Sequence, residues 1–101
     1  MKMQTLVPPQ TERRFQTSVL QLAAIHHWTR YHTYLSIRSE SGFPDVVLVR
    51  PPRLIFAELK TATGRVSRAQ EAWLGLLREV PCVETYLWRP GDLQEIARVL
   101  A

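Results

Sequence analysis

Three charged residues, Asp45, Glu58 and Lys60, accompany two apolar segments with the sequences VVLV and LIFA. These segments are typical of β-strands, and the short link between them favours an antiparallel hairpin. If the chain turns between Pro51 and Pro52, Asp45 lies directly opposite Glu58, and Lys60 follows on the same face because side chains alternate along a strand. The sequence therefore predicts two carboxylates and an ammonium at one end of a hairpin, unless a β-bulge shifts the register by one residue.

Two opposed carboxylates and a nearby ammonium are suited to metal-assisted hydrolysis of a phosphodiester. Directly opposed side chains have Cβ atoms roughly 4.5–5.5 Å apart, so two carboxylates in these positions repel each other. A divalent cation removes the repulsion, since Asp45 and Glu58 can both bind it at about 2.1 Å, a distance typical of magnesium. We expect the backbone carbonyl of Leu59 to join them. Lys60 can hold a phosphate oxygen, orient the attacking water or stabilise charge growing on phosphorus.

A purely structural interpretation of the same residues also exists. Asp45 could begin a strand, and Glu58 and Lys60 could form a salt bridge at the end of the sheet. We favour the site because three charged groups at the end of so apolar a hairpin are costly without a partner.

The remaining chain supplies further elements that must position this hairpin end. In chain order the predicted elements are a helix over 11–27, strands over 31–38, 44–49 and 54–60, a helix from Ser67 that stops before Pro81, a strand over 83–88 and a helix from Asp92. The order αβββαβα predicts an α/β domain in which helices flank a short mixed sheet.

Helix starts are marked by Thr11, Ser67 and Asp92 as N-caps, with Gln70 and Glu95 completing two capping boxes. Apolar residues at helical spacing then predict the inward faces of the three helices. These residues are Phe15, Val19, Leu22, Ala23 and Ile25; Ala69, Trp73, Leu76 and Leu77; and Leu93, Ile96, Ala97 and Leu100.

Length and composition restrict the class of protein. A chain of 101 residues suits one domain, which we place at 11–101 after a flexible arm at 1–10. A charged fraction of 22% disfavours disorder, and a net charge of +4 favours a polyanionic partner. The single cysteine, Cys82, excludes an internal disulfide and favours a reducing cytoplasm. No apolar run is long enough to span a membrane, and no signal peptide is recognised.

The hairpin residues resemble a known motif. Pro44-Asp45 followed by Glu58-Leu59-Lys60 is similar to the PD-(D/E)XK motif of restriction-endonuclease-like nucleases. The longer pattern GFPDVVLV, LIFAELK, GRVSRAQEAWL and YLWRPGDLQEI resembles the stand-alone VRR-NUC domain proteins of phages and prophages, over about residues 11–100. The resemblance implies a restriction-endonuclease-like core, Mg²⁺- or Mn²⁺-dependent nuclease activity on DNA, and often a homodimer. It also implies that Asp45 and Glu58 hold the metal and that Lys60 is the catalytic lysine.

Three further residues gain a role from this resemblance. The family places a glutamine near the active site at the position of Gln70, although its capping box alone explains the residue, and both roles can hold together. In many relatives an acidic residue on the first helix approaches the metal, and here that residue is Glu12, which could equally favour the helix dipole. Gln16 lies one turn further on the same face, where it could line the cleft.

Polar residues beside the hairpin end are candidate DNA contacts. They flank Pro44 or Gly64, and they are Arg38, Ser39, Ser41, Arg65, Ser67 and Arg68. Ser67 also begins a helix, whose N-terminal amides attract anions. The alternative for each arginine is a solvated surface position.

Histidines and tryptophans give weaker indications. His26 and His27 are adjacent and point in different directions, so we do not predict a zinc site; of the three histidines, His32 is best placed to face the cleft. We expect Trp73 to belong to the core and Trp88 to pack against the last helix, so neither is assigned as a platform for bases.

Together these features predict a divalent-metal-dependent DNA nuclease whose substrate could be a junction or a flap. A homodimer would place two active sites against two strands. The expected location is the cytoplasm, that of the bacterial host if a phage encodes the protein. The alternative is a non-catalytic nucleic-acid-binding module on the same fold, against which the complete set of Asp45, Glu58 and Lys60 argues. A plain structural protein whose charges form surface pairs is the third reading.

Overall fold

The computed structural model describes residues 11–33 and 40–101. The expected flexible arm at 1–10 and the candidate DNA contacts Arg38 and Ser39 lie outside the described residues. No helix within the described ranges is long and apolar enough to cross a membrane.

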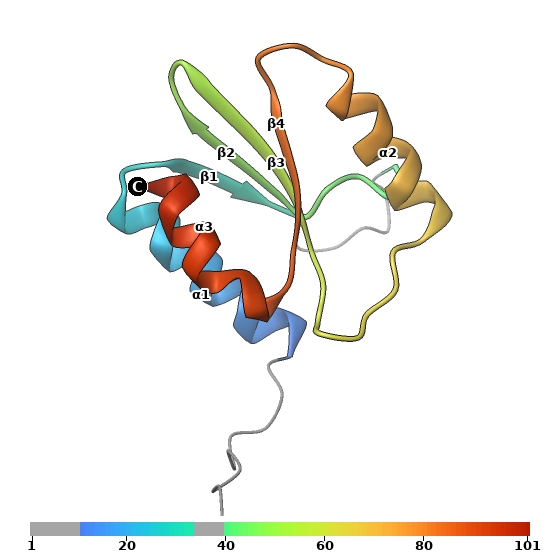
Figure 1. Ribbon diagram of the computed structural model, residues 1–101, viewed down its shortest axis with the longest axis horizontal. Helices are drawn as coiled ribbons and strands as arrows, with labels where there is room; N and C mark the ends of the chain where they lie inside the picture. Colours follow the sequence, from blue (N-terminus) through green and yellow to red (C-terminus); the bar gives the residue numbers. More distant parts are fainter. Residues whose placement is uncertain (1–10, 34–39) are drawn as a thin grey trace, which may run out of the picture.

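One mixed sheet forms the centre of the molecule, and its strands follow the order β1-β2-β3-β4 (Figure 1). The first three strands are antiparallel neighbours, and β4 runs parallel to β3. The elements are α1 (Glu12–Ile25), β1 (Thr29–His32), β2 (Val46–Arg50), β3 (Arg53–Leu59), α2 (Arg68–Arg78), β4 (Glu84–Trp88), a short 3-10 turn η1 (Pro90–Asp92) and α3 (Leu93–Leu100). The predicted mixed α/β architecture and its order are confirmed.

The hairpin has the predicted register. Val47 lies opposite Phe56, and Val46 lies opposite Ala57. No bulge interrupts the described ladder between β2 and β3, so the pairing continues towards Asp45 and Glu58. Beyond the hairpin, Lys60 donates its backbone N–H to the carbonyl of Trp88 at 3.0 Å, which extends the contact between β3 and β4 by one residue.

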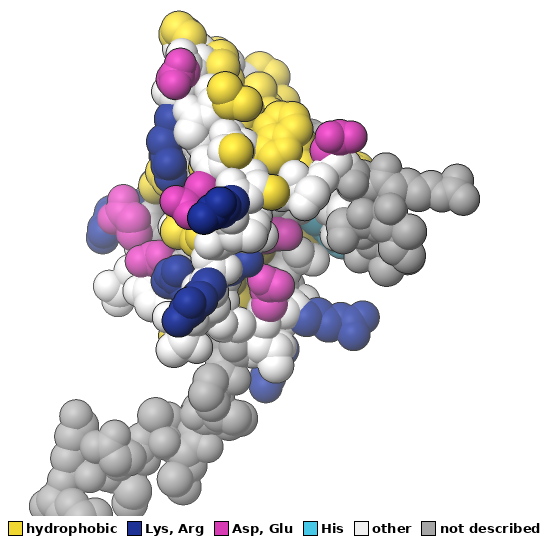
Figure 2. Space-filling view, turned by 90° about the vertical axis from the view of Figure 1, so that its right-hand side faces the viewer, with side chains coloured by type: hydrophobic (Ala, Val, Ile, Leu, Met, Phe, Trp, Pro, Cys, Tyr) yellow, Lys and Arg dark blue, Asp and Glu magenta, His cyan; other side chains and the backbone are white. Residues whose placement is uncertain are grey.

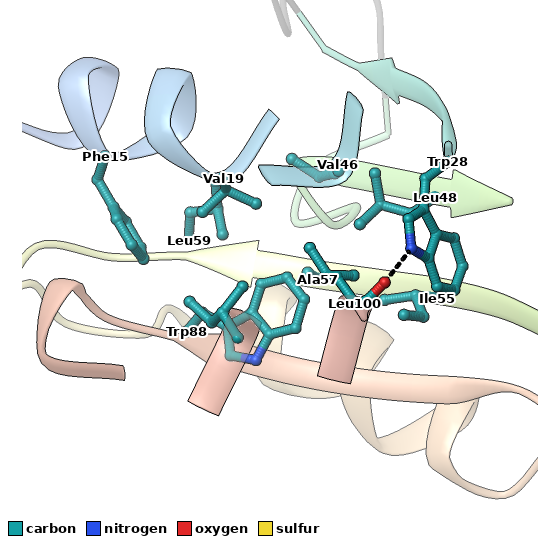
Figure 3. Close-up of a cluster of buried hydrophobic side chains, with 12 residues drawn as sticks. Phe15, Val19, Trp28, Val46, Leu48, Ile55, Ala57, Leu59, Trp88 and Leu100 are labelled. Atoms are coloured by element: carbon teal, nitrogen blue, oxygen red, sulfur yellow. Dashed lines mark hydrogen bonds between the residues drawn. The ribbon is translucent and has the colours of Figure 1, made fainter. Parts of the chain in front are cut away.

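Helices α1 and α3 cover one face of the sheet, and the hydrophobic core lies between them and the strands (Figure 3). Phe15, Val19 and Ala23 repeat every fourth position along α1 and are fully buried. Ile25 was expected to face inward but is 66% exposed, since it lies at the end of α1. Burial of this interface is the main force that holds the two helices on the sheet.

A cage of polar groups closes this core at the turn of the hairpin. The Trp28 indole lies beneath the guanidinium groups of Arg50 and Arg53, at 4.5 and 5.0 Å from its ring centre. Its Nε1 donates to the carbonyl of Leu100 at 2.9 Å (Figure 3). Arg53 also pairs with Glu84 through two hydrogen bonds of 2.7 Å. The turn of the hairpin is thereby tied to β4 and to the last turn of α3.

Helix α2 lies on the opposite face of the sheet (Figure 1). Trp73 packs edge-on against Phe43, and Phe43 packs edge-on against Phe56 of β3. Leu74 is the buried residue of this helix, whereas Leu76, predicted to face inward, is 64% exposed. The inward face therefore runs through positions 70, 73, 74 and 77 at helical spacing, which turns Gln70 towards the sheet.

Two predicted boundaries and one predicted capping box were wrong for local reasons. The first helix stops at Ile25, since His27 adopts a positive φ of 66° and starts a turn, and β1 therefore begins at Thr29. The Asp92 side chain does not form the expected capping box with Glu95. Instead it accepts the backbone N–H of Arg89 at 2.8 Å, which stabilises the turn η1 before α3 begins.

Replacement of Ile55 by alanine tests the assigned core. Ile55 is fully buried in β3, so Ile55→Ala should lower the free energy of unfolding by about 2–4 kcal/mol through lost transfer energy and a residual cavity. Ile25→Ala is the matched control at 66% exposure, and it should change stability by less than about 1 kcal/mol. Urea denaturation measures both; equal effects of the two substitutions would contradict the assigned core.

Candidate active site

The paired carboxylates lie where β2 begins and β3 ends. Asp45 directly precedes β2, and Glu58 is the penultimate residue of β3. The Asp45 Oδ2 atom accepts the backbone N–H of Leu59 at 2.9 Å, which fixes this carboxylate across the gap between the two strands. The register of the hairpin thus brings the two acidic side chains together, as the sequence predicts.

Glu58 is almost completely buried, with 1% of its surface exposed. Its Oε2 atom accepts a hydrogen bond from Gln70 Nε2 at 2.7 Å and lies 3.6 Å from the Lys60 ammonium. Its Oε1 atom is also buried and has no hydrogen-bond partner among the described residues. A buried carboxylate oxygen without a donor is costly, so this atom points to a missing electropositive partner.

The environment of Glu58 opposes its ionisation. Burial raises its pKa from 4.5 to about 8, and the negative charge of Asp45 acts in the same direction. The Lys60 ammonium lowers the pKa, whereas the charge of Glu12 raises it further. A bound divalent cation would reverse this balance, because it favours the ionised form of both carboxylates.

Gln70 forms the expected capping box and also contacts Glu58, whereas its role towards Lys60 or phosphate stays a prediction. Its backbone N–H donates to Ser67 Oγ at 3.1 Å, and its side-chain Oε1 accepts the Ser67 N–H at 2.8 Å, which forms the capping box. The other end of the same amide donates to Glu58. One side chain therefore starts α2 and orients the buried carboxylate.

Oxygen donors at this place fit a hard cation such as Mg²⁺ or Mn²⁺. Glu58 Oε1 lacks a partner, and Asp45 lies beside it with a carboxylate fixed by the backbone. In residues 11–33 and 40–101, no three His, Cys, Asp or Glu side chains form a metal-binding group by themselves. Backbone carbonyls, water or substrate would therefore complete the coordination. The roles of the Leu59 carbonyl and of Glu12 as ligands stay predictions.

A polar pocket of about 630 Å³ is lined by Asp45 and by Gln70, the partner of Glu58. Its walls come from the start of α1, the end of β1, the segment 40–45 and the start of α2, and they include Glu12, Gln16, His32, Asp45 and Gln70. Gln16 Nε2 lies 3.3 Å from His32 Nδ1 across this wall. Gln16 and His32 therefore line the cleft, as the sequence analysis suggests for both, and Glu12 lies in the same wall.

The other predicted DNA contacts among the described residues do not line this pocket but lie close in sequence to residues that do. All four are exposed: Ser41 precedes Asp45 in the chain, and Arg65, Ser67 and Arg68 precede Gln70. Viewed from the α2 side, charged side chains gather on the lower part of the surface and hydrophobic ones on the upper part (Figure 2). His26 and His27 lie at the opposite end of α1 from the pocket.

Arg89 is a residue that the sequence analysis missed. It follows β4, and its guanidinium reaches the segment after Lys60. The sequence Trp-Arg-Pro signalled only a turn at this position. An arginine directly after a strand that runs parallel to the Glu58 strand was the available clue, because the ends of parallel neighbours lie at the same edge of a sheet.

The chain folds as a mixed α/β domain with two carboxylates at the ends of neighbouring strands. The family model described as "VRR-NUC domain" matches residues 9–86. The chain belongs to the VRR-NUC domain family. A solved structure described as "VRR_NUC domain protein" shares the fold with a TM-score of 0.64 and 15% sequence identity, over 93% of each chain. No curated protein matches the sequence significantly.

Glu58→Gln tests the electrostatic cost of the buried carboxyl. The raised pKa of Glu58 means that the unfolded chain releases its proton near pH 4.5 and the folded chain only near pH 8, so stability falls across that window as the pH rises. Without metal, the free energy of unfolding of Glu58→Gln relative to the wild type should therefore increase by at least about 1 kcal/mol between pH 5 and pH 8.

Thermal and urea unfolding in EDTA at several pH values measures this difference. Glu71→Gln is the control. Glu71 is an exposed residue in the first turn of α2, and its side chain contacts neither Glu58 nor the partners of Glu58. Parallel pH profiles of the wild type and Glu58→Gln would show that the Glu58 carboxyl ionises without penalty.

Proposed function

We propose that the protein is a Mg²⁺- or Mn²⁺-dependent nuclease that hydrolyses phosphodiester bonds of DNA. The observation that carries this proposal is the buried Glu58 carboxyl, which has one unpartnered oxygen and lies beside Asp45 and Lys60. A structural protein gains nothing from such a group, since burial and like charge both destabilise it. Strongly shifted pKa values of this kind cluster at functional sites.

The residues divide the chemical work among them. Asp45 and Glu58 would hold the cation, which supplies charge neutralisation and an activated water when bound. Gln70 binds Glu58 Oε2 and so leaves Oε1 free to face the cation. The Lys60 ammonium lies next to the carboxylates, where it can bind a non-bridging phosphate oxygen and stabilise the negative charge that grows there during in-line attack.

DNA as the substrate is supported by the charge of the chain and by the groups beside the pocket. The net charge is +4, and Arg65 and Arg68 are exposed just before and at the start of α2. Arginine contacts to phosphate position a duplex without reading its sequence. We therefore propose that these residues and Ser41 bind the backbone of a DNA substrate, with a junction or flap as the preferred structure. The cytoplasm, that of a bacterial host if a phage encodes the chain, is the proposed location.

Cleavage assays test the proposal directly. Labelled linear, flapped and four-way-junction DNA is incubated with the protein in Mg²⁺, Mn²⁺ or EDTA. We expect cleavage only with metal, and a loss of at least about 100-fold in kcat for Glu58→Gln and for Lys60→Met. Glu58→Gln removes a charge that would hold the cation, and Lys60→Met removes the positive charge that would act on the phosphate. The exposed Glu71→Gln variant should retain wild-type activity.

The same experiment separates the nuclease from a binding module. Absence of cleavage on every substrate, together with DNA binding that EDTA does not change and salt weakens, would reject the nuclease. It would instead support a non-catalytic nucleic-acid-binding domain.

We further propose that two copies of the chain associate through the α2 side of the sheet. Tyr31, which lies opposite Val47 on that side, is 62% exposed, and Leu76 and Val80 of the α2 region are 64% and 46% exposed. Figure 2 shows hydrophobic side chains gathered on the upper part of this face. Such a cluster is suited to an interface between proteins.

Sedimentation velocity at micromolar concentration tests this association. The wild type should sediment as a dimer, and Leu76→Glu should shift it to the monomer, since a buried charge at an interface is costly. Glu79→Gln, an exposed change in the same helix region, is the control. A wild type that stays monomeric over this range would contradict the dimer.

A further inference from the structure

We propose that Arg89 is a positioning residue that holds the segment 61–64 over Lys60 and thereby directs the Lys60 ammonium towards Glu58. The link from Arg89 to the reaction rate rests on the nuclease function proposed above. The link from Arg89 to the placement of Lys60 stands on the contacts alone.

The Arg89 guanidinium is directed at backbone carbonyls of one short segment. Its Nη1 donates to the carbonyl of Thr61 at 2.7 Å and to that of Gly64 at 2.8 Å, with the carbonyl of Ala62 at 3.5 Å. Hydrogen bonds from a charged donor are roughly twice as strong as neutral ones. Arg89 itself is fixed, because its backbone N–H donates to Asp92 at 2.8 Å.

The segment that Arg89 holds lies against the Lys60 side chain. A Cβ atom built at Gly64 would lie 3.5 Å from Lys60 Cδ and 3.0 Å from Thr61 Oγ1. Only 14% of the Lys60 side chain is exposed, although lysine side chains are usually solvated. The segment therefore covers the methylene groups of Lys60 and restricts the directions that its ammonium can take.

Lys60 and Gln70, which both contact Glu58, lie on either side of the segment that Arg89 holds. Lys60 lies at its start, and Gln70 follows its end in the first turn of α2. The end of β4 and the segment after β3 lie beside each other at the edge of the sheet (Figure 1). Arg89 thus adds the end of β4 to a site otherwise formed by the hairpin and two helices.

Arginine suits this task because the Nη1 group of its planar guanidinium holds two N–H donors in a fixed plane, which serve the Thr61 and Gly64 carbonyls. A lysine at the same position would offer one ammonium on a flexible stem and could not reproduce the geometry at the Thr61 and Gly64 carbonyls. Arg89→Lys should therefore restore the positioning only in part, and Arg89→Met, which keeps the apolar stem and removes every donor, should abolish it.

Amine labelling measures the placement of Lys60 without any assay of activity. The chain contains two lysines, Lys2 and Lys60, so Lys2 provides an internal reference within the same molecule. Each variant is treated with a limiting amine-reactive ester in metal-free buffer, and the modified peptides are quantified by mass spectrometry. Relative to Lys2, Lys60 should react at least fivefold faster in Arg89→Met and to an intermediate degree in Arg89→Lys.

Arg98→Met is the matched control, because Arg98 is an exposed arginine of α3 that pairs only with Glu95 among the described residues. It should leave Lys60 labelling unchanged. Thermal unfolding verifies that each variant is folded, and if Arg89→Met does not fold, Arg89→Lys carries the comparison. A folded Arg89 variant in which Lys60 reacts at the wild-type rate would overturn the proposal.

Kinetics then connect the placement to the reaction. With Mg²⁺ or Mn²⁺ present, Arg89→Met should lower kcat at least tenfold and change KM for DNA by less than threefold. In the double variant, Arg89→Met should add little to the loss of kcat that Lys60→Met causes alone. A rise in KM with an unchanged kcat would instead make Arg89 a DNA contact and overturn the positioning role. If the wild type cleaves nothing, the nuclease function fails, and the labelling result still decides whether Arg89 places Lys60.

Discussion

The burial of Glu58 next to Asp45 is the constraint on which the site depends. Two carboxyl groups at the end of apolar strands destabilise the fold unless something neutralises them, and the protein's own groups do so only in part. Gln70 and Lys60 both act on one oxygen, which leaves the other without a partner. What the site lacks is therefore a positive charge beside Glu58 Oε1, and not packing or shape.

Several elements that are distant in sequence serve this one group. The register of β2 and β3 sets the separation of the carboxylates, and the rotation of α2 about its axis turns Gln70 towards Glu58. The parallel strand β4 ends beside β3, so Arg89 can reach the segment that covers Lys60. Each contribution comes from regular structure or its immediate ends, which is the arrangement that catalysis by fixed charges would require.

Local patterns predicted the hairpin and its register, because alternation along two strands and a two-proline turn leave few alternatives. They also predicted the capping box of Gln70, but not that the same amide donates to Glu58. The face of α2 was harder to predict: Leu76 and Leu74 are chemically alike, and only tertiary packing selects Leu74 for burial. Arg89 could not be assigned from its neighbours, because its partners are carbonyls about 25 residues earlier in the chain.

The Trp28 cage at the turn of the hairpin has an evolutionary consequence. Its two arginines tie the hairpin to β4 and to α3 at the end opposite the carboxylates. Stability and chemistry are thus assigned to different ends of the same two strands. A lineage that loses its acidic groups can keep a folded, inherited scaffold and adapt it to other tasks, whereas damage at the cage removes the scaffold itself.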